Sequence, residues 1–236
     1  MNSSKKESNI TWQNEYTPFS TKYGDVYFSA ENGMQESQYV FIDSNNLAAR
    51  FSTAKEFYIA ETGFGTGLNL ALACKLWKSV SAPKSRLYFT SFEKHPLTQN
   101  DITKAAENWP ELEFFYSSLL PAYSNLKPNS NIIELKEIGV VINIIVGDIN
   151  NTIISIADSI IDCWFLDGFA PSVNPEMWTD LVISSIARSA KQHSSFSTFT
   201  AAGNVRRALI KHGYKVEKKV GFGKKREMIF GSFTGS

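Results

Sequence analysis

Short hydrophobic runs alternate with longer stretches of helical periodicity along most of the chain. Apolar residues recur at the spacing of one helix face over 68–80, which predicts a helix there. The apolar run 57–60 predicts a strand before this helix, and 87–92 predicts the next strand after it. Regular alternation of this kind predicts an α/β domain, with a mostly parallel sheet covered by helices on both faces.

The same patterns predict the remaining core elements. The expected strands are 140–146, 162–167 and 195–199, and the expected helices are 97–109, 149–160, 177–191 and 205–212. The last two strand-like runs, 215–220 and 227–233, leave no room for a helix between them, so one strand at this end should be antiparallel. Residues 111–139 fit poorly because Pro121 and Pro128 interrupt them. We interpret 111–139 as an insertion that ends in a hairpin with the next strand.

The residues before the core divide into two parts. Residues 1–10 are polar and predict a flexible tail. Residues 11–56 predict a small N-terminal β-appendage, with strands at 25–28 and 38–42. The main domain is then expected over 57–236.

Composition narrows the class of protein. A chain of 236 residues with 43% hydrophobic residues can bury a core of one domain with appendages. It has neither a signal-like apolar start nor a membrane-length apolar run, so the expected location is the cytoplasm, with no membrane partner. Cys74 and Cys163 lie in apolar stretches and form no Cys-x-x-Cys pair, which predicts buried free thiols and no metal site.

A glycine-rich loop follows the first core strand. Its glycines at 63, 65 and 67 allow positive φ and close approach of a ligand to the backbone. A nicotinamide loop has the pattern Gly-x-Gly-x-x-Gly, whereas this loop lacks that spacing and begins with an acid, Glu61. That acid would repel a pyrophosphate but suits a ligand with an ammonium group, such as S-adenosylmethionine. The alternatives are a dinucleotide loop or a tight turn.

Three more acids stand at strand ends. Glu93 ends the second strand, where a carboxylate can accept hydrogen bonds from both ribose hydroxyls. Asp148 follows the third and could accept from the adenine amino group. The alternative for Glu93 is a solvated surface position. The alternative for Asp148 is the N-cap of a helix that begins at residue 149. Since parallel strands end at one edge of the sheet, the acids together are more specific than any one alone.

Asp167 ends the fourth strand. A carboxylate there can accept a hydrogen bond from an attacking amine and stabilise the charge that develops on it. The alternative is a turn Asp before Gly168. In-line methyl transfer to an amine then needs neither a strong base nor a metal.

Positive charge gathers near the C-terminus. Residues 203–226 carry nine Lys or Arg and one acid, a charge of +8, although the whole chain has only +1. This asymmetry predicts a polyanion against one edge of the molecule, with a solvated helix and strand face as the alternative. The candidate phosphate contacts are Arg206, Arg207, Lys224, Lys225 and Arg226. Trp109, Trp164 and Trp178 are expected in the core rather than as base-stacking platforms.

Several motifs together resemble one bacterial family. They are 25–29, 32–33, 39–41, 61–69, 91–94, 147–149, 164–171, 174–175, 177–178, 198–200 and 221–228. In order and over nearly the whole chain, these stretches resemble the methyltransferase half of the tRNA 5-methylaminomethyl-2-thiouridine biosynthesis proteins (MnmC) and its stand-alone relative (MnmD). The runs Phe-Leu-Asp-Gly-Phe-Ala-Pro at 165–171 and Gly-Phe-Gly-Lys-Lys-Arg-Glu at 221–227 are the most specific, and 111–139 match least.

The resemblance implies a class I, Rossmann-like methyltransferase with a seven-stranded sheet and one antiparallel strand. The implied reaction methylates the aminomethyl nitrogen of 5-aminomethyl-(2-thio)uridine at the tRNA wobble position, with the anticodon stem-loop as partner. Asp167 would be catalytic. The cofactor-binding residues would be Glu61, Gly63, Phe64, Gly65, Gly67, Leu68, Asn69, Glu93, Lys94, Asp148, Ile149 and Asp167. Larger family members continue into a flavin-dependent oxidase domain; this chain has no second glycine-rich fingerprint, so carboxymethyl removal is not expected of it.

Three other functions stay open from the sequence. A methyltransferase for a small amine or catechol would need no tRNA, so labelled methyl would not enter bulk tRNA. A non-catalytic RNA-binding module would not bind S-adenosylmethionine. Such a module does not need the four strand-end acids, so their presence speaks against it. A nicotinamide dehydrogenase is least favoured because of the loop spacing.

Overall fold

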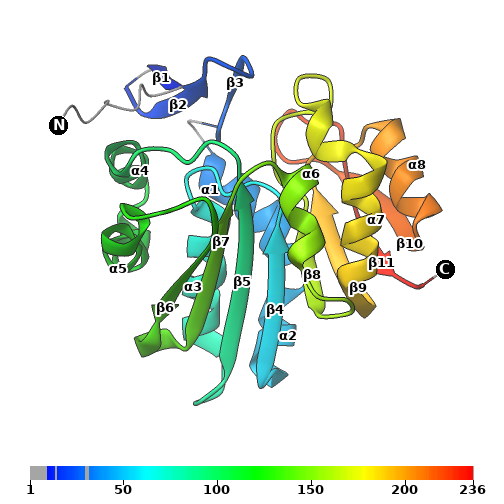
Figure 1. Ribbon diagram of the computed structural model, residues 1–236, viewed down its shortest axis with the longest axis horizontal. Helices are drawn as coiled ribbons and strands as arrows, with labels where there is room; N and C mark the ends of the chain where they lie inside the picture. Colours follow the sequence, from blue (N-terminus) through cyan, green and yellow to red (C-terminus); the bar gives the residue numbers. More distant parts are fainter. Residues whose placement is uncertain (1–9, 14, 30–31, 236) are drawn as a thin grey trace.

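An eight-stranded sheet forms the centre of the computed structural model, which describes residues 10–13, 15–29 and 32–235 (Figure 1). Its strands are β4 (Glu56–Glu61), β5 (Arg86–Glu93), β6 (Asn129–Leu135), β7 (Val140–Val146), β8 (Ile161–Phe165), β9 (Ala190–Thr198), β10 (Tyr214–Val220) and β11 (Glu227–Phe233). Their order is β10-β11-β9-β8-β4-β5-β7-β6. The five strands from β9 to β7 are parallel, whereas β6 and β11 run against them. The predicted α/β class with a mostly parallel sheet is therefore confirmed.

Each face of the sheet carries its own apolar core, because successive strand residues point to opposite faces. In β4, Ile59 packs into one core and Ala60 into the other. The first core is covered by α1 (Gly33–Ser37), α2 (Leu47–Thr53), α3 (Leu68–Val80), α4 (Gln99–Ala106) and α5 (Glu113–Tyr123), and the second by α6 (Ile149–Thr152), α7 (Asp180–Ser189) and α8 (Gly203–Lys211). Trp109 and Trp164 are buried in these cores, as predicted. Cys74 and Cys163 are buried free thiols, also as predicted.

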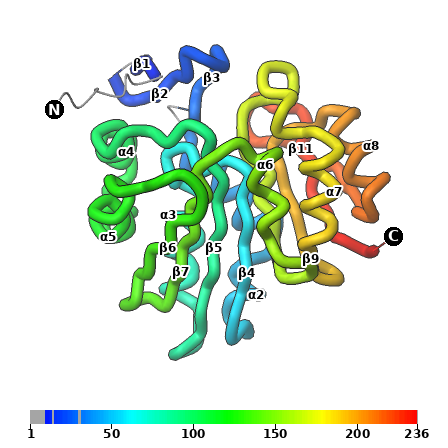
Figure 2. Tube along the Cα trace, in the orientation of Figure 1, coloured from blue at the N-terminus to red at the C-terminus, as the bar shows by residue number. Residues whose placement is uncertain are grey.

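A small antiparallel sheet stands apart from the main one. It consists of β1 (Ile10–Gln13), β2 (Thr17–Ser20) and β3 (Asp25–Val26). Figures 1 and 2 show it at the end of the main sheet where the parallel strands finish. Residues 23–27, which contain β3 and are called the β3 segment below, lie beside the loop that follows β8. Residues 1–9 of the predicted tail lie outside the described residues, and Ile10 already belongs to β1.

The predicted strand at 38–42 is wrong, because these residues form the π-helix η1 (Gln38–Asp43) between α1 and α2. Val40, Phe41 and Ile42 are all buried, so the short apolar run has no polar face to reveal its period. Just after it, Asn45 donates from Nδ2 to the carbonyl of Phe41 and to Ser197 Oγ, at 2.8 and 2.7 Å. This fixes the helical segment against β9.

The stretch 111–139 contains a helix that the sequence pattern did not predict. Pro121 lies inside α5, in its last turns, rather than ending it. The helix buries Phe115, Tyr116 and Leu119 against the first core, and this packing outweighs the missing backbone donor. The hairpin expected at the end of the stretch is present as β6 and β7. It adds an eighth strand and a second antiparallel one to the seven-stranded sheet expected with a single antiparallel strand.

Short 3₁₀ segments complete the connections. They are η2 (Pro110–Leu112), η3 (Lys136–Ile138), η4 (Ile153–Ser155) and η5 (Pro175–Trp178). Of these, η4 and η5 take the place of parts of the longer helices expected at 149–160 and 177–191. Only α6 and α7 are α-helical in those ranges. Within the described ranges, no helix has both the length and the apolar character needed to cross a bilayer.

Candidate functional site

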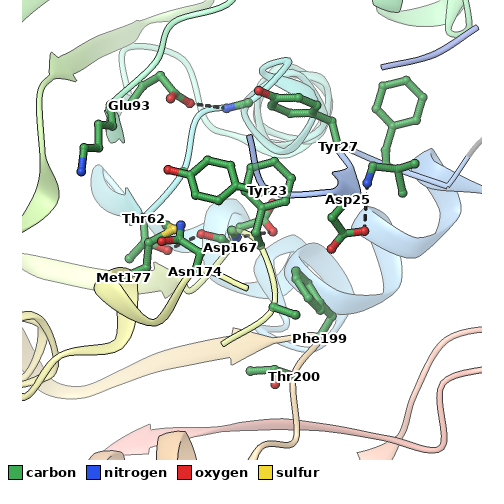
Figure 3. A pocket seen from close by; sticks show the side chains of 18 of the residues that line it. Tyr23, Asp25, Tyr27, Thr62, Glu93, Asp167, Asn174, Met177, Phe199 and Thr200 are labelled. Atoms are coloured by element: carbon green, nitrogen blue, oxygen red, sulfur yellow. Dashed lines mark hydrogen bonds between the residues drawn. The ribbon is translucent and has the colours of Figure 1, made fainter. Parts of the chain in front are cut away.

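A cavity of about 720 Å³ lies at the carboxyl ends of the parallel strands, beside the β3 segment (Figure 3). Its wall includes predicted site residues that follow four different strands: Gly63, Gly65, Glu93, Lys94, Asp148, Ile149 and Asp167. The remaining predicted cofactor residues are buried behind this wall and do not line it: Glu61, Phe64, Gly67, Leu68 and Asn69. The site is therefore built at the edge of the sheet where open α/β folds bind ligands.

The loop between β4 and α3 holds its backbone against neighbouring strand ends. Gly65 and Gly67 have φ values of +53° and +79°, in the left-handed region that favours glycine. The Gly65 amide donates to Glu93 Oε2 at 3.0 Å, which ties the loop to the end of β5. A Cβ on Gly63 would lie 3.2 Å from the carbonyl oxygen of Asp167, so the loop also abuts the end of β8.

Replacing Gly67 by alanine is expected to destabilise the protein more than the same change at Gly223. Both glycines have positive φ, which costs an alanine about 1–2 kcal/mol. At Gly67 the added Cβ would also lie 2.9 Å from Cζ of the buried Phe64 ring, whereas at Gly223 nothing lies within 4 Å. Urea unfolding should give a free energy of unfolding at least about 1 kcal/mol lower for Gly67→Ala than for Gly223→Ala. Equal losses of unfolding free energy in the two variants would show that the Phe64 ring moves aside without a measurable cost.

Glu61 is a carboxyl enclosed by the protein, with 1% of its surface exposed. Oε1 accepts from Asn69 Nδ2 at 2.8 Å, and Oε2 accepts from Ser91 Oγ at 2.7 Å. Burial, followed by the nearby charge of Asp167, raises the pKa of Glu61 well above its usual range. Both oxygens already have partners within the protein, so the predicted contact of Glu61 with a ligand's ammonium group stays a prediction.

Asp167 presents its carboxyl at the cavity wall in a fixed orientation (Figure 3). Oδ2 accepts from Asn69 Nδ2 at 2.6 Å, and Oδ1 accepts from the Gly168 amide at 2.8 Å. The Asn69 amide group thus bridges Asp167 and Glu61. Burial raises the pKa of Asp167 to about 6, while these two hydrogen bonds and the charge of Lys225 act in the opposite direction. At neutral pH the group is a positioned, mostly ionised acceptor.

Glu93 joins two backbone segments at the cavity. Besides the Gly65 amide on Oε2, its Oε1 accepts from the His95 amide at 2.7 Å. Burial raises the pKa of Glu93, and the backbone hydrogen bonds counteract that rise. Each oxygen keeps a second lone pair, so the carboxylate can still accept from two neighbouring hydroxyls of a ligand.

Asp148 caps a helix and forms an ion pair at the cavity wall. Its Oδ1 accepts from the Asn150 amide at 2.9 Å and caps α6, which is the alternative considered from the sequence. Oδ2 accepts from Lys94 Nζ at 2.6 Å, and this pairing is the main reason that the pKa of Asp148 falls to about 2. Lys94 also pairs with Glu176 at 3.0 Å. The carboxylate is ionised at the cavity wall, and its contact with adenine stays a prediction.

Aromatic and acidic residues on the cavity wall escaped the sequence reasoning. Tyr23 stacks on Phe169 with ring centroids 4.6 Å apart, and Tyr27 meets Phe169 edge-on at 5.3 Å. Glu36 and Met177 line the same cavity. One signal could have found part of this set, because Phe169 stands two residues after Asp167 and Tyr27 lies in a motif that carries the family resemblance.

The five predicted phosphate contacts lie on two neighbouring elements. Arg206 and Arg207 belong to α8, and the other three belong to the turn between β10 and β11, which the structure places beside each other at one end of the sheet (Figure 1). Lys225 differs from the rest, because it lines the cavity and pairs with Glu36 at 2.5 Å. Within the described chain, no acid lies at ion-pair distance from the remaining four.

Comparison with known proteins places these residues in a family. Residues 110–234, more than half of the chain, match the model of a family described as S-adenosyl-L-methionine-dependent methyltransferase. The chain is 40% identical to the tRNA 5-methylaminomethyl-2-thiouridine biosynthesis bifunctional protein MnmC of Methylobacillus flagellatus, over 97% of this chain and 35% of that protein. The MnmC protein of Aliivibrio fischeri is 42% identical, over 95% and 35%. The chain thus spans about a third of the length of these relatives.

A solved structure resembles the whole described fold. The crystal structure of MNMC2 from Aquifex aeolicus superposes with a TM-score of 0.77 at 25% sequence identity, and the match covers 100% of this chain and 73% of that one. A spermidine synthase in complex with a transition-state analogue, AdoDATO, superposes with a TM-score of 0.55 at 10% identity, which speaks to the fold alone.

Proposed function

Because this chain belongs to the S-adenosyl-L-methionine-dependent methyltransferases, we propose that it transfers a methyl group to the aminomethyl nitrogen of 5-aminomethyl-(2-thio)uridine at the tRNA wobble position. The observation that carries the proposal is the Asp167 carboxylate, held by two hydrogen bonds on the wall of the cavity that the glycine loop also lines. The identity of the acceptor nucleoside is inferred from the name of the relatives, which refers to 5-methylaminomethyl-2-thiouridine in tRNA. We assign to this chain the methyl transfer alone, in the cytoplasm, and leave any oxidase step to another domain or protein.

The cavity wall fits the cofactor of this family in its chemistry. The backbone at Gly63 and Gly65 is open to close approach by a ligand. Glu93 offers acceptors for the ribose, and Asp148 is ionised on the same wall. The wall carries six carboxylates and two lysines, and this negative balance suits a cationic sulfonium with an ammonium group. Bound S-adenosyl-L-methionine supplies an electrophilic methyl group.

Asp167 then acts on the acceptor amine. An amine attacks only when neutral. The positive charge of a bound sulfonium and the partly dry cavity would both favour loss of its proton, because a like charge and burial disfavour the ammonium form. The ionised carboxylate accepts a hydrogen bond from the amine N–H, which orients the nitrogen lone pair. As the new N–C bond forms and the S–C bond to the methyl group breaks, the same carboxylate stabilises the positive charge that moves to nitrogen, and the neutral thioether S-adenosylhomocysteine leaves. The proton is lost to water after transfer.

The decisive experiment analyses nucleosides from tRNA that carries 5-aminomethyl groups. After incubation with the protein and the methyl donor, mass spectrometry should detect 5-methylaminomethyl-(2-thio)uridine and a matching loss of its precursor. Tritiated methyl appearing in small amines but not in this tRNA would instead support the small-amine methyltransferase. Calorimetry without any binding of S-adenosyl-L-methionine would support the non-catalytic RNA-binding module.

Removing unpaired basic side chains is expected to weaken tRNA binding and to flatten its salt dependence. Arg207→Gln and Lys224→Gln each remove a charge that no described acid neutralises. If each contacts one phosphate, the slope of log affinity against log salt should shrink by about 1 per residue. Filter binding between 50 and 200 mM salt measures this slope.

Lys218 provides a matched control in the same basic segment. It is already paired with Glu227 at 2.6 Å, so Lys218→Gln should change the slope far less. Equal slopes for all three variants would place the tRNA on another surface of the protein.

A further inference from the structure

Three aromatic rings form a surface inside the cavity, next to Asp167. Tyr23 and Tyr27 come from the β3 segment, and Phe169 comes from the loop after β8. Phe169 stacks on Tyr23 at 4.6 Å with an interplanar angle of 28°, and it meets Tyr27 edge-on at 5.3 Å. All three rings are only half-buried, whereas other large aromatics, such as Phe165 and Phe196, are fully buried in the cores.

The rings differ in how closely they approach the glycine loop. Tyr27 lies against the glycine loop, since a Cβ added to Gly65 would be 3.4 Å from its ring. Tyr23 has no atom within 4 Å of that Cβ, and Figure 3 shows Tyr23 next to Asp167 in the middle of the cavity. Phe169 follows Asp167 by two residues in the chain, so the Tyr23–Phe169 pair lies next to the carboxylate that we assign to the acceptor amine.

Charge separates the inside of the cavity from the surface around it. The wall carries more carboxylates than lysines, so phosphate groups are repelled from the interior. Outside, Lys22 is exposed with its ammonium 5.1 Å from the centre of the Tyr23 ring, and unpaired basic residues lie beyond the cavity. An amine-bearing base can therefore enter while its backbone phosphates stay in solvent.

We propose that Tyr23 and Phe169 form the stacking surface that receives the unstacked uridine ring and directs its 5-substituent toward Asp167. The inference rests on the proposed function and adds the residues that bind the base. Flat aromatic faces bind single bases of RNA by stacking, in a way that depends on the ring and not on its hydroxyl. Tyr23 is a positioning residue in this scheme, because it contacts the base and not the reacting atoms.

Substitutions at Tyr23 test the stacking directly. Tyr23→Phe should retain the kcat/KM for tRNA within about twofold, whereas Tyr23→Leu should lose about tenfold to hundredfold, mainly through KM. Leucine keeps an apolar side chain against Phe169 but lacks the flat π face. The affinity for S-adenosyl-L-methionine, measured by calorimetry, should stay unchanged in both variants. Tyr16→Leu is the matched control, because Tyr16 is a 53% exposed tyrosine in the same segment and does not line the cavity.

A photochemical test uses the unaltered protein. An anticodon stem-loop with 5-iodouridine at the wobble position should cross-link to Tyr23 or Phe169 under ultraviolet light, because 5-iodouracil reacts with aromatic rings that it stacks on. Mass spectrometry of the peptides locates the cross-link. If the protein methylates tRNA but Tyr23→Leu behaves as Tyr16→Leu does, or the cross-link falls elsewhere or does not form, the stacking surface is wrong. If the protein does not methylate tRNA at all, the proposed function fails first.

Discussion

Asp167→Ala is expected to reduce the rate of methyl transfer about 100-fold or more while leaving the affinity for S-adenosyl-L-methionine nearly unchanged. The carboxylate is fixed by Asn69 and the Gly168 amide, so it offers the amine an acceptor that needs no reorganisation. Without it the nitrogen loses both its orientation and the nearest negative charge, and losses of this size follow from either effect. Single-turnover transfer to tRNA measures the rate, and calorimetry measures the affinity.

Two further variants separate charge from shape. Asp167→Asn retains the size of the side chain and an acceptor oxygen but removes the charge, so its rate should lie between those of the native protein and Asp167→Ala. Asp25 is a carboxylate on the same cavity wall, hydrogen-bonded to the Val26 amide at 2.8 Å, and Asp25→Asn should change the rate by no more than about threefold. Native turnover in Asp167→Ala would remove the assigned role.

The pH profile supplies an independent readout of the same residue. Burial raises the pKa of Asp167 to about 6, and its ionised form is the active acceptor, so kcat/KM should fall as the pH drops through about 6. Lys225 lowers this pKa and Glu36 raises it. Lys225→Met should therefore move the acid limb to higher pH, and Glu36→Gln should move it to lower pH. A limb that persists in Asp167→Asn would belong to another group.

The periodicity of apolar residues predicted those elements that bury one face and leave the other face polar. The helix expected over 68–80 and the strand expected over 227–233 match α3 and β11 at both ends. In the run 38–42 the residues Val40, Phe41 and Ile42 are all buried, so the pattern shows no clear period and is no evidence for a strand. The helix α5 was missed for a different reason: Pro121 was interpreted as a break, but a proline near a helix end is tolerated when the helix is packed.

The candidate site was predictable where it depends on strand ends alone. Glu93, Asp148 and Asp167 line one cavity because parallel strands finish at one edge of the sheet. The ion pair of Lys94 with Asp148 spans 54 residues, and the Tyr23–Phe169 stack spans 146, so both need the folded chain. The tryptophans were expected in the core rather than as stacking platforms, and Trp109 and Trp164 are buried there. Tyr23 and Tyr27 on the cavity wall come from a segment interpreted only as an appendage, whereas Phe169 comes from the loop after β8.

Glu93→Ala is expected to weaken S-adenosyl-L-methionine binding at least about 100-fold. If the carboxylate accepts both ribose hydroxyls, two charge-assisted hydrogen bonds are lost, each contributing about 1.5–3 kcal/mol. The variant also leaves the Gly65 and His95 amides without their acceptors, which loosens the glycine loop. Calorimetry should show the dissociation constant rising by this factor. Glu93→Gln retains one acceptor oxygen but turns an NH₂ group toward a backbone amide, so an intermediate loss of about tenfold is expected.

Glu176→Ala is the matched control for this effect, because Glu176 is a carboxylate on the same cavity wall whose side chain pairs with Lys94 and not with the loop. Lys94 keeps Asp148 as a partner in that variant, so cofactor affinity should change by no more than about threefold. Equal losses in both variants would mean that the overall negative charge of the cavity holds the cofactor. A loss of affinity confined to the Glu93 variant would mean that the Glu93 carboxylate both fixes the backbone of the loop at Gly65 and presents its remaining lone pairs to the ribose.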